Sequence, residues 1–144
     1  MTRVEDANAA LARRWFDEGW SRGAVDIAEE VFADDFVLRG RRVGPGGPRR
    51  SVQWIRSAFA PMTVHIGRQI AQDSTVVTLY TARGKHTGEY RGIPATHRWV
   101  TATGVQIWTV LDGKVVEDHN VFDEWGLMQQ LSQGQAQPTA AARG

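Results

Sequence analysis

The sequence predicts an α+β domain, and three observations support this prediction. Apolar residues recur with helical spacing in three segments between residues 4 and 60, and from residue 63 onward they alternate with a period of two. The Asp-Gly-Lys sequence at 112–114 marks a hairpin turn between the last two of four strands. Helices that follow one another and then a run of strands pack on one face of a sheet. We therefore expect a curved antiparallel sheet wrapped around three N-terminal helices, forming a cone with a central pocket.

The helical half is expected to contain helices over residues 4–20, 24–32 and 48–60. Val4, Leu11 and Trp15 fall on one face of the first segment, which is typical of a helix that packs on a core. Pro48 suits the first turn of the third helix, because the amide hydrogen that proline lacks would have no helical partner there. The arginine-rich segment 39–50 also contains Gly and Pro, and we interpret it as a solvated loop.

The second half alternates apolar and polar residues in four expected strands, over residues 63–72, 75–90, 99–111 and 115–123. Asp123 is expected to cap a short C-terminal helix that carries Leu127, Met128 and Leu131. The domain is expected to span residues 1–132, and residues 133–144 are expected to form a disordered tail, because they contain few large apolar side chains.

Composition excludes several classes of function. The chain has 144 residues and a formal net charge of +1, which fits one globular domain without a nucleic-acid footprint. It has no cysteine, no apolar run of membrane-spanning length and no N-terminal signal pattern, so a cytoplasmic protein is expected. The four histidines lack zinc-ligand spacing, and nucleotide-loop and serine-elbow motifs are absent.

Residues 84–131, which begin "GKHTGEYRGIPATHRW" and continue through "DGKVVEDHNVFDEWGLMQQL", resemble the SnoaL-like polyketide cyclases. The segment "WFDEGWSRGAVDIAEEVFADDFV" (15–37) matches the helical half of that family more loosely. The resemblance implies the α+β cone of nuclear transport factor 2 and a homodimer formed through the open sheet face. It also implies a hydrophobic small-molecule substrate and chemistry without a metal or cofactor.

The last strand carries the main catalytic candidates. Side chains alternate along a strand, so Asp118, Asn120 and Phe122 share one face, which we expect to point inward. The resemblance places the family's catalytic aspartate on Asn120 and an assisting histidine on Gln106, and neither amide can take up a proton. Asp118 is therefore the predicted general acid or base, with a pKa raised by an apolar pocket. The alternative is a structural aspartate paired with Arg68 or Arg98.

The same alternation on the neighbouring strands predicts the rest of the pocket. Gln106 and Trp108 share one face of the strand 99–111, and Tyr80 and His86 share one face of the strand 75–90. His86 is a second catalytic candidate because imidazole titrates near neutral pH, although it could instead brace the adjacent loop. We expect a substrate to bind against flat aromatic side chains and an amide donor. The expected substrate-binding residues are Gln106, Trp108, Tyr80, Trp15 and Phe122.

These residues favour an enzyme of secondary metabolism that closes a ring or isomerises a polyketide-like substrate, with Asp118 removing a proton next to a carbonyl. A second hypothesis is epoxide opening, in which Asp118 and Tyr80 or His86 share the acid and base roles. A third is a binding or accessory protein without catalysis, which the amides at Gln106 and Asn120 favour.

Overall fold

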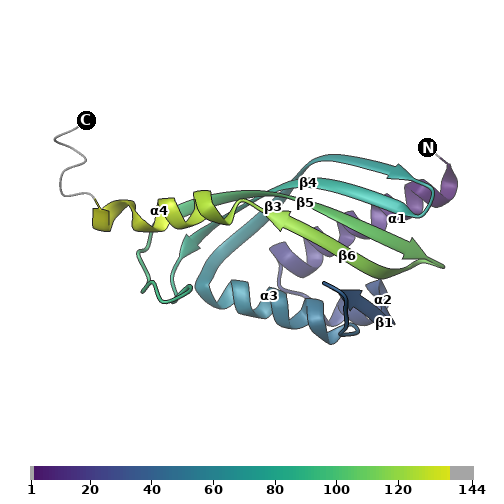
Figure 1. Ribbon diagram of the computed structural model, residues 1–144, viewed down its shortest axis with the longest axis horizontal. Helices are drawn as coiled ribbons and strands as arrows, with labels where there is room; N and C mark the ends of the chain where they lie inside the picture. Colours follow the sequence, from purple (N-terminus) through teal and green to yellow (C-terminus); the bar gives the residue numbers. More distant parts are fainter. Residues whose placement is uncertain (1, 137–144) are drawn as a thin grey trace.

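The structure, a computed structural model, describes residues 2–136. It confirms the α+β class: a curved six-stranded sheet that does not close carries the helices of the N-terminal half on its concave side, and the C-terminal helix extends past one end of the sheet (Figure 1). The helical elements are α1 (Arg3–Arg14), the π-helix η1 (Trp15–Ser21), the 3₁₀ helix η2 (Val25–Ile27), α2 (Ala28–Val31), α3 (Gly46–Ala58) and α4 (Glu124–Ala136). The strands are β1 (Phe32–Leu38), β2 (Arg41–Arg42), β3 (Phe59–Gln72), β4 (Thr75–His86), β5 (Trp99–Leu111) and β6 (Lys114–Phe122).

The sheet has the strand order β2-β1-β6-β5-β4-β3. The expected antiparallel meander is confirmed as β3 to β6, but two strands were not predicted as part of the sheet. The extended piece after α2 becomes β1 and runs parallel to β6, with Leu38 opposite Asp118. The sheet therefore contains one parallel pair besides the expected antiparallel strands, because the free edge of β6 recruits a segment that lies far away in the sequence.

Strand ends also differ from the predictions. β3 begins at Phe59 rather than at residue 63, and a register shift between Ile66 and Arg68 places a bulge at Gly67. Bulges bend a strand and increase its twist, which helps the sheet curve around the helices. β4 ends at His86 rather than at residue 90, because the chain then turns and Gly88 packs against the backbone of Ser57.

The first expected helix is confirmed, with a change of pitch in its second half. Thr2 caps α1 and forms a reciprocal capping box with Glu5. From Trp15 to Ser21 the helix widens into η1, where a side chain at Gly19 would collide with the Trp15 ring. The second expected helix over residues 24–32 is shorter than predicted, because a 3₁₀ turn precedes the single turn of α2 and Phe32 already belongs to β1.

α4 begins as predicted and ends later. The Asp123 carboxylate accepts a hydrogen bond of 2.9 Å from the backbone amide of Gly126, which confirms the N-terminal cap. The helix runs to Ala136, so it passes the domain boundary that was expected at residue 132. Residues 137–144, the remainder of the expected tail, lie outside the described residues. Within residues 2–136, no helix is long and apolar enough to cross a membrane.

Two groups of buried side chains form the core. The first gathers Trp15, Phe32 and Trp108, with the Phe32 ring edge-on to both indoles at 5.0 and 5.5 Å. The second gathers Phe16, Tyr80 and Leu131, among others, at the other end of the sheet. Members of both groups line a cavity, which places the candidate site inside the cone.

Candidate active site

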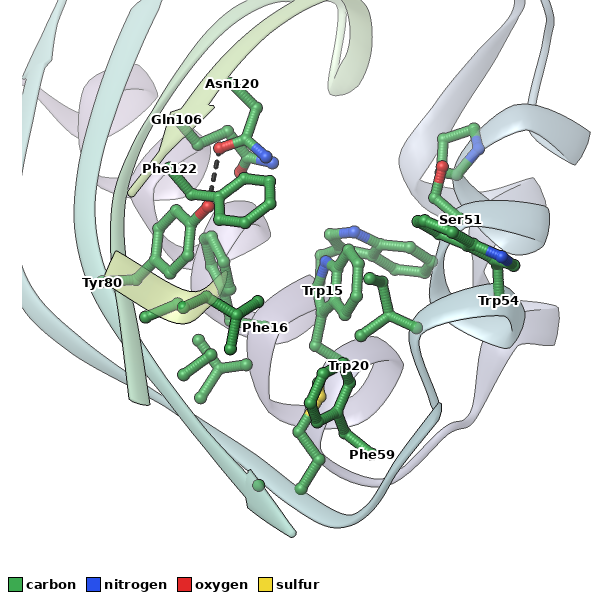
Figure 2. A pocket seen from close by; sticks show the side chains of 18 of the residues that line it. Trp15, Phe16, Trp20, Ser51, Trp54, Phe59, Tyr80, Gln106, Asn120 and Phe122 are labelled. Carbon is green, nitrogen blue, oxygen red and sulfur yellow. Dashed lines mark hydrogen bonds between the residues drawn. The ribbon is translucent and has the colours of Figure 1, made fainter. Parts of the chain in front are cut away.

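A cavity of about 360 Å³ lies between the concave face of the sheet and the helices. The helices contribute Trp15, Phe16 and Trp20 from η1 and Ser51 and Trp54 from α3 (Figure 2). The sheet faces them with side chains from five strands, β1 and β3 to β6, including Tyr80, Gln106, Asp118, Asn120 and Phe122. A cavity of this size with mainly apolar walls and a few polar groups is typical of a small-molecule site.

The alternation of β6 is confirmed, since Asp118, Asn120 and Phe122 all line the cavity. Their depth differs along the strand: Asp118 is buried, whereas Asn120 is exposed, because β1 covers the edge of β6 only as far as the pair Leu38 and Asp118. The cavity therefore has a closed end at Asp118 and an open end beyond Asn120. Gln106, Tyr80 and Trp15, three of the expected substrate-binding residues, also line it.

Asp118 is the buried acid of the cavity, with 8% of its surface exposed. Burial raises the pKa of its carboxyl group from 3.8 to about 7, although the Trp108 indole and the Gln106 amide favour the ionised form. The Gln106 Nε2 group donates a 3.3 Å hydrogen bond to Asp118 Oδ2. Asp118 Oδ1 and Gln106 Oε1 are buried without a hydrogen-bond partner in the described part of the chain.

An ion pair does not hold Asp118. Among residues 2–136, no arginine or lysine forms a salt bridge with it. Arg98 instead donates to the backbone carbonyl of Gln130 at 3.1 Å, and Arg68 lies opposite Leu79, which points away from the cavity. The alternative in which Arg68 or Arg98 neutralises Asp118 is therefore wrong.

Tyr80 reaches across β5 to Asn120. The Tyr80 hydroxyl donates a 2.8 Å hydrogen bond to Asn120 Oδ1, and burial raises the pKa of the phenol to about 12 (Figure 2). Gly104 on β5 pairs with Tyr80 of β4 on one side and with Phe122 of β6 on the other. A Cβ atom at this position would collide with the Tyr80 hydroxyl and would lie 2.5 Å from Cζ of Tyr80. Because Asn120 Oδ1 is occupied, its amide nitrogen is the group left to donate to a ligand.

Trp108 and His86 have the predicted parity but lie outside the cavity lining. Trp108 is buried beneath Phe32 and directly opposite Asp118 in the register, so the expectation that it offers a flat surface to the substrate is wrong. Its indole Nε1 is buried without a hydrogen-bond partner in the described part of the chain, although the neighbouring indole lowers the pKa of the Asp118 carboxyl group.

His86 braces the loop between β4 and β5. Its Nδ1 accepts a 3.1 Å hydrogen bond from the backbone amide of Thr96, and its ring lies 5.3 Å from Phe59. Burial lowers the pKa of the imidazole, which keeps it neutral. The structure thus places His86 apart from Asp118 and corrects the catalytic expectation, because Phe59 and the loop cover its face of the strand.

Several lining residues escaped sequence reasoning. Phe16, Trp20 and Trp54 supply apolar wall, and the abundance of tryptophan was the signal that could have suggested them. Arg39 and Arg91 also line the cavity, and both come from turns, where no periodic pattern applies. In the part of the chain that the structure describes, no group of three His, Asp or Glu side chains could hold a metal ion.

The fold and the cavity together define a class of protein. An open curved sheet around helices, with a pocket inside, is the cone of the nuclear transport factor 2-like domains. The sequence profile of the SnoaL-like polyketide cyclases matches residues 10–131, and the chain belongs to that family. The family and the curated relative described below are polyketide cyclases, which supports a cyclase role for this chain in general terms.

The chain is similar to several individual proteins. Nogalonic acid methyl ester cyclase of Streptomyces nogalater is 25% identical over 118 residues, which cover 78% of this chain and 88% of that protein. A protein of Jannaschia sp. CCS1 assigned as a SnoaL-like polyketide cyclase superimposes with a TM-score of 0.81 and 22% identity, covering 92% of this chain and 96% of the other. AclR of Streptomyces galilaeus, assigned as a hydroxylase, gives 0.79 and 21%, with 90% and 98% covered. These two structural likenesses show the fold alone.

Proposed function

We propose that the protein is a cofactor-independent cyclase or isomerase acting on a polyketide-like intermediate of secondary metabolism, with Asp118 as its general acid and base. The observation that carries the proposal is the buried Asp118 carboxyl group, which lines an apolar cavity, has one oxygen without a partner and has a pKa of about 7. A group with that pKa is divided between its two protonation states near neutral pH, so it can both accept and return a proton.

The proposed reaction begins when the Asp118 carboxylate removes a proton from a carbon next to a substrate carbonyl. The negative charge moves onto the carbonyl oxygen to give an enolate. The Asn120 amide nitrogen, oriented by the Tyr80 hydroxyl at 2.8 Å, is placed to donate to that oxygen. Asn120 thus keeps a role in stabilising charge although it cannot transfer a proton.

Ring closure follows when the enolate carbon attacks a second carbonyl of the same molecule. A carbon–carbon bond forms, the second carbonyl becomes an alkoxide, and the protonated Asp118 returns the proton to it. Substrate and product are isomers, so no atoms are gained or lost. The aromatic walls from Trp15, Phe16 and Trp20 would hold both ends of the chain together, and such positioning can supply ~7–11 kcal/mol of the barrier.

The test is mass spectrometry of linear and partly cyclised polyketide esters and epoxides incubated with the protein. A product of unchanged mass and new retention time supports cyclisation or isomerisation. Gain of one water would support the epoxide-opening alternative. Ligand binding without any turnover would support the accessory-protein alternative.

Two variants test whether Asp118 carries out the proton transfer. Asp118→Asn removes the titrating group with little change in shape, whereas Glu117→Gln makes the same change on the neighbouring residue of the opposite strand face. We expect the first variant to lose turnover by a factor of at least about 100, the lower end of general acid–base contributions, and the second to retain it. Equal turnover by wild type and Asp118→Asn would remove Asp118 from the mechanism.

We also propose a homodimer formed through the convex face of the sheet. Leu79, Ile107 and Val121 lie on neighbouring strands of that face and are exposed, and Leu79, Val105 and Val121 are aligned across three strands. Contiguous apolar surface of this kind is typical of a protein interface.

A further inference from the structure

The open end of the cavity is basic, in contrast to its apolar walls. Of the charged residues that line the cavity, three are arginines and one is the acid Asp118. Arg83 is engaged elsewhere, because its guanidinium lies 4.0 Å from the centre of the Trp99 ring. The other two are Arg39 and Arg91, which are exposed residues that line the cavity.

Arg39 is held in the turn between β1 and β2. It follows Leu38, the register partner of Asp118, so its backbone lies level with the part of β6 that leads to Asn120. Its φ angle of 53° belongs to a tight turn that fixes where its side chain begins. Its positive charge lowers the pKa of both Asp118 and Glu124. Among residues 2–136 its side chain forms no hydrogen bond or ion pair.

Arg91 is held by aromatic rings and one carboxylate. Its guanidinium lies 5.3 Å from the Trp54 ring centre and 5.5 Å from that of Tyr90, and it pairs with Glu124. The Tyr90 hydroxyl donates to the same Glu124 oxygen at 2.7 Å. Glu124 therefore neutralises Arg91, and Arg39, which has no ion-pair partner among residues 2–136, carries the uncompensated positive charge at the rim.

This charge distribution orients a ligand. Guanidinium groups bind carboxylates and phosphates through paired hydrogen bonds, and charges beside an apolar cavity focus their field into it. An anionic group would be attracted to the rim and repelled from the ionised Asp118 at the closed end. The uncharged part of the same molecule would then enter first, toward the acid.

We propose that Arg39, assisted by Arg91, forms an anion site at the mouth of the cavity that holds a terminal carboxylate or phosphate of the substrate while its carbonyl-bearing part reaches Asp118. The proposal names the substrate class and rests on the proposed function only in taking this cavity as the substrate site. Its test is equilibrium binding, which does not require turnover.

The experiment compares 2-naphthoic acid with its methyl ester, a pair that shares the aromatic body and differs in charge. Quenching of tryptophan fluorescence reports occupancy directly, since Trp15, Trp20 and Trp54 line the cavity. The wild-type protein should bind the acid more tightly than the ester. Arg39→Gln should weaken binding of the acid roughly tenfold and leave the ester unchanged, because a charge-assisted contact is lost. The matched control is Arg41→Gln, because Arg41 is an exposed arginine at the start of β2 that does not line the cavity.

A second pair distinguishes the source of the anion: the naphthoyl thioester of pantetheine and its 4′-phosphate. Preference for the naphthoic acid alone supports a free carboxylic acid as substrate, and preference for the phosphate alone supports a carrier-linked substrate. Either preference must disappear in Arg39→Gln. Equal binding of charged and neutral partners in both pairs, or equal loss of acid and ester binding in Arg39→Gln, overturns the anion site.

The two proposals fail separately. If the wild-type protein shows the charge preference but turns over no substrate, the anion site stands and the cyclase mechanism falls. If turnover depends on Asp118 and charged and neutral ligands bind equally well, the cyclase mechanism stands and the anion site falls.

Discussion

Replacing Asp118 with asparagine should make the stability of the protein less sensitive to pH. In the folded protein burial raises the pKa of this carboxyl group from 3.8 to about 7. The unfolded chain exposes the group to water and restores its ordinary pKa. Between these two values the folded state holds a proton that the unfolded state releases, so the free energy of unfolding falls as the pH rises.

The size of the effect follows from the pKa difference. At about 1.4 kcal/mol for each unit of pKa, ionising Asp118 inside the cavity costs ~4 kcal/mol once the pH is well above 7. Most of this cost, about 3 kcal/mol, arises between roughly pH 5 and pH 8, because folded and unfolded states differ most in bound protons there. Domains of this kind are stable by about 5–15 kcal/mol, so the loss is a large fraction of the total.

Urea unfolding of wild type and Asp118→Asn, followed by tryptophan fluorescence and circular dichroism at both pH values, measures this difference. The wild-type protein should lose about 3 kcal/mol more than the variant on going from about pH 5 to pH 8. Glu117→Gln, on the outer face of the same strand, should follow the wild-type curve. Parallel pH dependence of wild type and Asp118→Asn would refute the assignment of a raised pKa to this carboxyl.

Four further outcomes are expected. The value of kcat/KM should rise with pH and level off above about 7, since the Asp118 carboxylate is the base; a decrease over that range contradicts the mechanism. Tyr80→Phe should lower kcat about fivefold in a folded protein, because Asn120 loses its hydrogen bond from the Tyr80 hydroxyl. Gly104→Ala should lower kcat at least as much, because it displaces the Tyr80 ring. Additive losses in the double variant would show that the two changes do not act through the same hydrogen bond. His86→Ala should lower the free energy of unfolding by ~2–4 kcal/mol, because it leaves a cavity and an unpaired Thr96 amide, while the folded variant keeps most of its kcat. A complete loss of kcat in the folded variant would instead support a catalytic role for His86. Ile107→Lys should convert a dimer to a monomer in analytical ultracentrifugation, and an unchanged mass would exclude this face as the interface.

The sequence predicts best what depends on local geometry. The alternation of side chains along β6 places Asp118, Asn120 and Phe122 on the cavity side, because this pattern follows from the strand backbone alone. The cap formed by Asp123 is likewise a contact between residues three apart. Both features could be predicted without knowing which distant segments pack together.

The sequence predicts poorly what depends on packing between distant segments. Trp108 and Tyr80 share an inward parity, yet only Tyr80 reaches the cavity, because the Phe32 ring covers Trp108. The pairing of β1 with β6 joins segments separated by most of the chain, and alternation carries no signal for it. Arg39 and Arg91 belong to turns, where the conformation that aims a side chain has no periodic signature.

The π-helix η1 makes the cavity sensitive to the helical pitch at one place. Its wide turn, with hydrogen bonds between residues five apart, presents Trp15, Phe16 and Trp20 together to the cavity. At the α-helical pitch of 3.6 residues per turn, with no residue removed, Trp20 would lie about 140° around the helix axis from Trp15. The shape of this binding wall therefore depends on the pitch of one turn, and a return to the α-helical pitch would change it with every aromatic side chain still present in the sequence.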